Sequence, residues 1–254
     1  MIKAKKSYGQ HFLRDPYHAE RIANSLPDTA SLAVLEIGPG QGALTKFLLN
    51  RFQNIKMVEI DPRMVTILQK ELNVPLEKII QKDVLHCDWR LFFNEDFWVC
   101  GNFPYNISTQ IVFNILENRT IVAGMVGMFQ KEVGRRITSG PGSKEYGIQS
   151  VMTCFYFESE YLFELAPQEF DPPPMVHSAV IKLVRRPKPL YEFDYTKMLK
   201  LVKLAFNQRR KKLSNALSSL QIQKDEKILS LWDKRAENLS AEDYYEIYIR
   251  LYKN

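Results

Sequence analysis

Residues 33–45 read AVLEIGPGQGALT, and this stretch decides the fold class. The apolar run AVLEI predicts a buried strand, the glycines predict a tight turn, and residues 43–52 (ALTKFLLNRF) predict a helix. The glycine spacing is G-x-G-x-G rather than the G-x-G-x-x-G of dinucleotide-binding proteins. Glu59 follows 21 residues after Gly38, where a carboxylate can accept hydrogen bonds from both ribose hydroxyls. The pattern favours a nucleoside ligand over a turn that binds nothing.

Outward from this turn, short apolar runs alternate with helical patterns. This alternation is typical of βαβ units, a parallel sheet and helices on both faces, with ligands beyond the carboxyl ends of the strands. Strands are predicted at 33–37, 55–60, 79–81, 97–100, 121–129, 150–157 and 176–184, and helices at 43–52, 63–72, 109–116, 195–220, 224–235 and 240–252.

The run RRPKP at 185–189 is basic and rich in proline, and it predicts a domain boundary. We therefore divide the chain into an α/β domain (1–187) and a small helical domain (188–254). Within the second domain, Ser240 followed by Asp243 predicts the start of the last helix.

The composition excludes several classes of protein. Of the 254 residues 45% are hydrophobic and 25% charged, which is typical of a globular protein. The longest apolar run, 122–129, has about eight residues, whereas a membrane span needs roughly 20. The basic N-terminus is not followed by an apolar stretch, so we expect no secretory signal, no membrane contact and a cytoplasmic protein. Cys87, Cys100 and Cys154 form no CxxC pair and the four histidines no HxxxH pattern, so no metal is predicted.

Basic charge gathers at both ends of the chain. Residues 185–254 hold sixteen Lys and Arg against nine Asp and Glu, while residues 1–14 carry Lys3, Lys5, Lys6 and Arg14 without an acid. Such a distribution suits a phosphate-rich partner, although a solvated surface explains it equally well.

The segment GNFPYN at 101–106 follows the fourth predicted strand. An Asn-x-Pro-Tyr turn places an amide oxygen (Asn102), a backbone carbonyl (Phe103) and an aromatic face (Tyr105) together. Two acceptors that hold the hydrogens of an adenine amine would favour its pyramidal, reactive form, while Tyr105 stacks on the base. The alternative is a proline turn with a buried tyrosine.

Two further residues have a functional and a structural interpretation. Asp83 follows the third strand, where an acceptor suits an adenine amino group, or it is a helix cap or a loop acid. Phe170 precedes the stiff run Asp171-Pro172-Pro173-Pro174 and offers a second aromatic face for an extruded base, or it is a core residue.

Taken together, these segments closely resemble the ribosomal RNA adenine dimethyltransferase family that acts on small-subunit RNA. The matching pieces run in family order: KKSYGQHFL (5–13), VLEIGPGQGALT (34–45), VEIDPRM (58–64), KDVL (82–85), GNFPYNIS (101–108), FQKEVGRRI (129–137), FDPPPMVHSAV (170–180) and AFNQRRKKLSNAL (205–217). The resemblance implies a Rossmann-like class I methyltransferase sheet of α/β class with a small C-terminal all-helical domain. It also implies S-adenosylmethionine as methyl donor, S-adenosylhomocysteine as product, and dimethylation of two adjacent adenosines in a 3′-terminal hairpin loop of small-subunit ribosomal RNA during subunit biogenesis.

The resemblance carries over to single positions. It implies a catalytic set of Asn102, Pro104, Tyr105 and Phe170, with Tyr105 and Phe170 on either side of the target base. The implied donor-binding set is His11, Leu13, Gly38, Gly40, Glu59, Asp83, Val84 and Asn102, and the implied RNA-binding set, on a basic helix, is Arg209, Arg210, Lys211 and Lys212. His11 stands where many members have Asn, and Phe103 where Leu is commoner. The expected partner is ribosomal RNA in an immature 30S-type particle, bound by a monomer.

Three other functions compete with this one. A related family methylates large-subunit RNA and confers macrolide-type resistance, and the glycine loop and the NxPY turn do not separate the two. GQHFL, FDPPPMVHS and FNQRRKKL favour the small-subunit enzyme. A second alternative is a non-enzymatic assembly or transcription factor on the same scaffold, and the retention of Glu59, Asn102, Pro104 and Tyr105 argues against it. A third is an NAD-dependent oxidoreductase, and the glycine spacing and the NxPY turn argue against that one.

Overall fold

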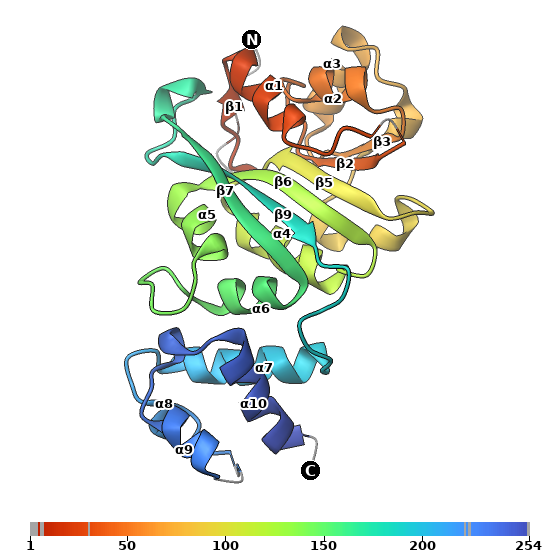
Figure 1. Cartoon of the computed structure of the whole chain (residues 1–254). Coiled ribbons are helices and arrows are strands. Elements are labelled where there is room, and N and C mark those ends of the chain that lie inside the picture. The colour runs from red at the N-terminus through yellow and green to blue at the C-terminus, as the bar shows by residue number, and fades with distance from the viewer. Residues whose placement is uncertain (1–4, 6–7, 30, 221, 223–224, 253–254) are drawn as a thin grey trace. The chain divides into compact units, whose positions relative to one another are not determined.

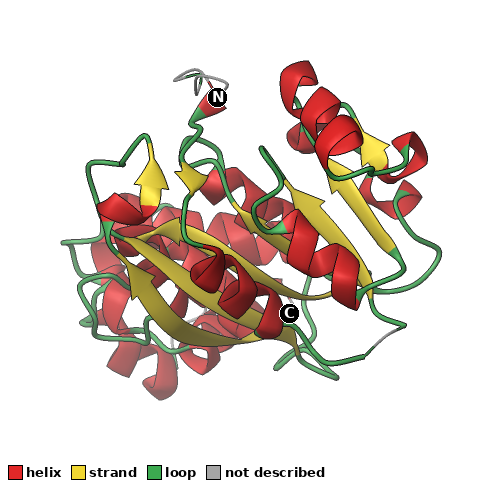
Figure 2. Ribbon diagram, turned by 90° about the horizontal axis from the view of Figure 1, so that it is seen from above, coloured by secondary structure: helices red, strands yellow, loops and turns green. Residues whose placement is uncertain are grey.

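The computed structural model describes residues 5, 8–29, 31–220, 222 and 225–252. It contains a seven-stranded sheet, drawn among the yellow arrows in Figure 2, and Figure 1 labels its strands apart from the short one at Ile79–Ile80. The strand order is β4 (Ile79–Ile80), β3 (Ile55–Val58), β2 (Ala33–Ile37), β5 (Phe97–Asn102), β6 (Val122–Gln130), β9 (Ser178–Arg185) and β7 (Phe157–Leu165). The first five strands are parallel, and β9 runs antiparallel to β6. The predicted α/β class is confirmed, and the strands of the first half are parallel as the alternation predicts, while the addition of β9 makes the whole sheet a mixed one.

The first predicted strand lies in the middle of this sheet. All five residues of β2 are buried, because it pairs with β3 on one side and β5 on the other. Three helices bury apolar side chains in the cluster that holds Val34 of β2 and Met57 of β3: α1 (Pro16–Asn24), α2 (Thr45–Arg51) and α3 (Pro62–Glu71). A further helix, α4 (Ser108–Glu117), follows β5. The glycine turn follows β2, Glu59 follows β3 and the NxPY turn comes at the end of β5. Because these three strands are parallel neighbours, all three features lie at the carboxyl ends of the strands.

One predicted strand is wrong. Residues 150–157 were expected to be extended, but α6 (Ile148–Tyr156) is a helix and β7 starts at Phe157. Seven of the nine α6 residues are buried, so the helix shows no polar face from which its period can be seen. The Ser150 hydroxyl accepts the N–H of Gly147 (2.9 Å) and so serves as a cap at the start of the helix.

The pattern also missed several short elements. These are α5 (Lys131–Thr138), five 3₁₀ turns (76–78, 84–86, 89–91, 167–169, 236–238), helix α1, and a separate two-stranded ladder of β1 (Phe12–Leu13) with β8 (Phe170–Asp171). The ladder joins Phe12 to Asp171 and Leu13 to Phe170, which are about 160 residues apart.

The chain forms two compact units, residues 1–134 with 159–185 and residues 135–158 with 186–254. The second unit therefore includes 135–158, which our single division at residue 187 assigned to the first domain. The physical reason is aromatic packing within the second unit: Phe155 of α6 meets Phe193 with ring centroids 4.7 Å apart. Its other helices are α7 (Tyr195–Asn207), α8 (Leu213–Ala216), α9 (Glu226–Trp232) and α10 (Ala241–Tyr252).

The predicted helix 195–220 is interrupted. Helix α7 ends at Asn207, residues 208–212 form a turn, and α8 begins at Leu213. The predicted start of the last helix is confirmed: Asp243 N–H donates to the Ser240 hydroxyl (3.1 Å) and Ser240 N–H to the Asp243 carboxylate (3.0 Å). Within the described part of the chain, no helix has both the length and the apolar composition needed to cross a membrane.

Candidate active site

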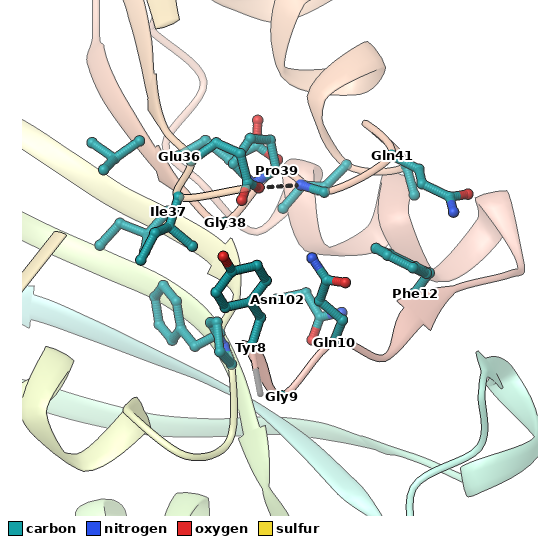
Figure 3. Close-up of a pocket in the computed structure, with 18 of the residues that line it drawn as sticks. Tyr8, Gly9, Gln10, Phe12, Glu36, Ile37, Gly38, Pro39, Gln41 and Asn102 are labelled. Carbon is teal, nitrogen blue, oxygen red and sulfur yellow. Dashed lines mark hydrogen bonds between the residues drawn. The ribbon is translucent and has the colours of Figure 1, made fainter. Parts of the chain in front are cut away.

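A pocket of about 530 Å³ opens in the first unit at the carboxyl ends of the central strands. Figure 3 shows the glycine loop (Glu36–Gln41) on one side and the N-terminal residues Tyr8, Gln10 and Phe12 on the other. The volume suits a nucleoside-sized ligand. The predicted site residues that line it are His11, Leu13, Gly38, Gly40, Glu59, Asp83, Val84, Asn102, Pro104 and Tyr105.

The glycine loop holds the buried acid at the end of β3. Gly40 has φ +56°, a left-handed conformation, and a side chain added there would lie 3.1 Å from the ring of Phe12. In this conformation Gly40 N–H donates to Glu59 Oε2 (3.0 Å), while Asp61 N–H donates to Oε1 (2.8 Å). Burial raises the pKa of Glu59, and these two backbone donors act against it. Each oxygen retains acceptor capacity for a ligand hydroxyl.

A second acid in the pocket, Glu36, was missed by the sequence analysis. It lies in β2, is 1% exposed, and its Oε2 has no hydrogen-bond partner among the described residues. Its pKa is raised to about 8, chiefly by burial, while the nearby Thr45 hydroxyl acts against this rise and the negative charge of Glu59 adds to it. An acid inside the apolar strand AVLEI was the available signal, because buried charges in such runs need a reason.

The segment VEIDPRM fastens the N-terminal residues to the pocket. Asp61 caps α3 by accepting from Arg63 N–H (3.1 Å) and binds the Arg63 guanidinium with both carboxylate oxygens. These bonds lower the pKa of Asp61 to about 2. Gln10 Nε2 donates to Asp61 Oδ2 (3.2 Å), so the segment GQHFL lies next to the part of the pocket that Glu59 lines.

Asp83 caps a turn, as one of its two interpretations predicts, because its Oδ1 accepts from Leu85 N–H (2.9 Å) at the start of a short 3₁₀ turn. It also lines the pocket, and its contact with an adenine amino group stays a prediction. Val84 beside it is buried and lines the pocket as an apolar surface. A half-buried acceptor next to an apolar side chain is suited to an adenine ring.

The NxPY turn places its polar atoms as the sequence analysis expected. Asn102 Nδ2 donates to the His11 carbonyl (2.8 Å), which leaves Oδ1 as the acceptor of that side chain. The carbonyls of Pro104 and Tyr105 accept from Ile107 N–H and the Ser108 hydroxyl. Among the described residues, the Phe103 carbonyl has no such donor.

The Phe103 side chain anchors this turn in the core. It is 1% exposed, and its ring occupies the space above Gly127 of β6, where an added Cβ would lie 2.1 Å from Phe103 Cε2. Pro104 in turn lies 3.6 Å from the position that a Gly38 Cβ would take. The turn and the glycine loop therefore lie close together in the lining of the pocket.

Tyr105 is held by a residue that the sequence analysis did not single out. Its hydroxyl hydrogen-bonds to the Ser178 hydroxyl (2.5 Å) at the buried start of β9. Burial raises the pKa of Tyr105, so the phenol stays protonated at neutral pH. One face of its ring stacks on His11, with centroids 5.2 Å apart and an interplanar angle of 27°.

Phe170 does not lie where we expected it. It is fully buried, pairs with Leu13 in the β1–β8 ladder and does not line the pocket. The aromatic ring next to Tyr105 is instead that of His11, whose Nδ1 donates to the Pro172 carbonyl (2.7 Å). The core interpretation of Phe170 fits this structure, and its contact with a substrate base stays a prediction.

The four residues predicted on a basic helix lie in a turn, where two of them form ion pairs with described residues and two do not. Arg209 pairs with Glu237 (2.6 Å) and Lys212 with Asp233 (2.7 Å), whereas Arg210 and Lys211 are exposed. At the other end of the chain, Lys3 and Lys6 lie outside the described residues. Arg210 and Lys211 thus differ from the other two cations of the turn because they form no ion pair with any described residue.

A group of metal-ligating side chains lies outside the pocket. Single ligand atoms of Asp15, His18 and Glu169 lie within 4.8 Å of one another. Asp15 caps α1 through Tyr17 N–H (2.8 Å), and His18 Nε2 lies 3.5 Å from Glu169 Oε2. Helix capping and an ion pair account for this group.

Comparisons with known proteins agree with this geometry. The family described as Ribosomal RNA adenine dimethylase matches residues 1–253. Two bacterial relatives, both called ribosomal RNA small subunit methyltransferase A, are 43% identical. The one from Parabacteroides distasonis aligns over 97% of this chain and 93% of its own, and that from Flavobacterium johnsoniae over 96% and 94%.

Solved structures show the same fold. A dimethyladenosine transferase from Plasmodium falciparum superposes with a TM-score of 0.80 over 93% of this chain and 96% of its own, at 23% identity. The 23S rRNA methyltransferase ErmE superposes with a TM-score of 0.76 over 94% and 99%, at 28% identity. The sheet is therefore that of a class I methyltransferase.

Proposed function

Since the chain belongs to the ribosomal RNA adenine dimethylase family and is an rRNA adenine dimethyltransferase, we propose that it modifies two adjacent adenosines in the 3′-terminal hairpin loop of small-subunit ribosomal RNA. The observation that carries this proposal is the shared pocket of Glu59, the glycine loop and the NxPY turn. One cavity thus combines a nucleoside-binding acid with two acceptors for an adenine amine.

Methyltransferases of this kind use S-adenosylmethionine, and the pocket residues fit that donor. When bound, it supplies an electrophilic methyl group on a positively charged sulfur. Glu36 would receive a cationic group, because its buried Oε2 has no partner among the described residues. Glu59 would accept from ribose hydroxyls, and Asp83 with Val84 would hold the adenine. The backbone of Gly38 and Gly40 and the segment containing His11 and Leu13 complete the proposed site.

The chemistry at the target amine is assigned to the NxPY turn. Asn102 Oδ1 and the Phe103 carbonyl would accept the two amine hydrogens, which localises the nitrogen lone pair. Pro104 fixes the turn, and the Tyr105 ring would stack on the base. The methylated nitrogen carries a positive charge and loses its proton readily, so this chain needs no general base for the step.

The partner and the setting are proposals as well. We propose that ribosomal RNA within an immature small subunit is the substrate, that the enzyme acts as a monomer, and that it works in the cytoplasm, where subunits mature. The basic charge of residues 185–254 supports contact with RNA phosphates.

The decisive experiment measures methyl transfer from labelled S-adenosylmethionine to purified subunits that lack adenine dimethylation, followed by mass analysis of the nucleosides. Dimethyladenosine in small-subunit RNA would support the proposal. Transfer only to large-subunit RNA would favour the second candidate, which the similarity to ErmE supports. Particle binding without transfer would favour a non-catalytic assembly role.

A further inference from the structure

The segment from Pro172 to His177 joins β8 to β9 and carries the most exposed apolar side chain among the described residues. Met175 is 101% exposed, and Val176 beside it is 44% exposed. Pro174, in contrast, is buried, so the loop is held from beneath while the Met175 side chain faces outward. Three consecutive prolines restrict the backbone before this tip.

Both ends of this loop are fastened to the active site. At its start, the Pro172 carbonyl accepts from His11, whose ring stacks on Tyr105. At its end, the His177 carbonyl accepts from Lys131 N–H (2.9 Å), and the next residue, Ser178, binds the Tyr105 hydroxyl. Met175 thus lies three residues after Pro172, which is bonded to His11 beside Tyr105. It also lies three residues before Ser178, which is bonded to Tyr105 itself.

An exposed apolar residue on a stiff, anchored loop suits one task in the proposed reaction. An adenosine that reacts in a pocket must leave its base stack, and this costs stacking energy. Apolar side chains such as methionine can enter the vacated space and stack on the neighbouring base. Methionine suits this role because its thioether is polarizable and adapts to a base surface.

We propose that Met175 is a wedge that fills the gap left by the target adenosine and so positions that adenosine against Tyr105. This inference rests on the proposed function and adds a residue that lies outside the pocket. Exposed apolar side chains are common in isolation, and Leu91, 78% exposed on the 3₁₀ turn 89–91, provides a comparison without bonds to the pocket rim.

The test compares Met175→Ala, Met175→Leu and Leu91→Ala with the unsubstituted protein. The substrate is small subunits that lack dimethylation, at saturating enzyme and S-adenosylmethionine. Single-turnover transfer is expected to fall about ten-fold in Met175→Ala and to recover largely in Met175→Leu, because leucine keeps most of the apolar volume with which a wedge fills the vacated space. Leu91→Ala should transfer at the unsubstituted rate, and all variants should share one melting temperature and one donor affinity.

A second readout reports the base stack directly. Target-loop RNA with 2-aminopurine beside the target adenosine should brighten when the unsubstituted protein binds and brighten less with Met175→Ala. A Met175→Ala transfer rate within about two-fold of the unsubstituted protein would overturn the wedge, since lost stacking costs more than that. Equal losses in Met175→Leu and Met175→Ala would overturn it too. Absence of transfer by the unsubstituted protein would instead overturn the proposed function, and the wedge with it.

Discussion

The side-chain amide of Asn102 donates to the backbone carbonyl of His11 at 2.8 Å. This bond fixes the amide orientation, because only Nδ2 can donate, and it leaves Oδ1 to accept from a substrate. The N-terminal segment and the NxPY turn, 91 residues apart in sequence, therefore orient each other.

Replacing Asn102 by Ala tests the assignment of this amide. The change removes one of the two proposed acceptors for the amine hydrogens, so we expect methyl transfer to fall by roughly 100-fold or more. Binding of small subunits should persist, because Asn102 lies in the pocket and outside the basic surfaces. Transfer and particle binding are measured side by side. A variant that transfers normally would remove Asn102 from the chemistry, and one that loses both would show that binding depends on the same turn.

Tyr105 and Ser178 give a matched pair of substitutions. Tyr105→Phe and Ser178→Ala each remove the same hydrogen bond and keep the ring, so each should slow transfer a few-fold and cost about 1 kcal/mol of stability. Because both remove one interaction, the double variant should be little worse than either alone. Tyr105→Ala removes the stacking surface and should be far slower. Additive losses in the double variant would mean that the hydroxyl bond does not hold the ring.

The raised pKa of Glu36 predicts that the free energy of unfolding depends on pH. Its pKa is about 8 in the folded chain, against an ordinary value of 4.5 for a glutamate side chain. Between these pH values the unfolded chain has released the proton that the folded chain retains, so stability falls as pH rises from about 4.5 to about 8 and is then unaffected by this group. Glu36→Gln should remove that loss, which is on the order of 4 kcal/mol.

The measurement is urea unfolding of both proteins at pH 5 and pH 8. Glu77→Gln, on an exposed turn, is the control and should follow the unsubstituted protein at both pH values. An equal difference between Glu36→Gln and the unsubstituted protein at pH 5 and pH 8 would mean that the buried acid is not protonated in the folded chain.

Gly127 tests how the Phe103 side chain supports the site. An alanine Cβ would lie 2.1 Å from Phe103 Cε2, so the ring and its turn must shift. We expect Gly127→Ala to cost about 1–3 kcal/mol and to slow transfer. At Gly140 an added Cβ meets nothing within 4 Å, so Gly140→Ala is the matched control and should leave transfer unchanged. Normal activity in Gly127→Ala would show that the turn tolerates movement of Phe103.

The sequence predicted the sheet and most of the pocket because both depend on local patterns. The strand AVLEI, its glycines and the acid 21 residues later follow from backbone sterics and the geometry of parallel strands. The run SVMTCFYF was misassigned because a segment buried on nearly all sides has no visible period.

Contacts between residues far apart in the sequence could not be predicted. The pairing of Phe170 with Leu13 buries a ring that we expected in the pocket, and no local pattern signals that ladder. The same holds for the bond from Tyr105 to Ser178. Glu36 had a local signal, an acid within a buried strand, whose meaning needed the three-dimensional site.

Two cations of the turn 208–212, Arg209 and Lys212, form ion pairs, so the predicted RNA contact of this turn can be tested apart from its internal pairing. Arg210 and Lys211 are exposed, so Arg210→Gln with Lys211→Gln should weaken RNA binding and flatten the plot of log affinity against log salt by about one to two units. Arg209→Gln with Lys212→Gln removes the same charge but breaks ion pairs with Glu237 and Asp233. That double variant should lower the melting temperature and change the salt slope less. Affinity is measured from about 50 to 200 mM salt, where phosphate contacts dominate. An unchanged slope in the first double variant would place the RNA surface elsewhere on the chain, because a lost phosphate contact must appear in that slope.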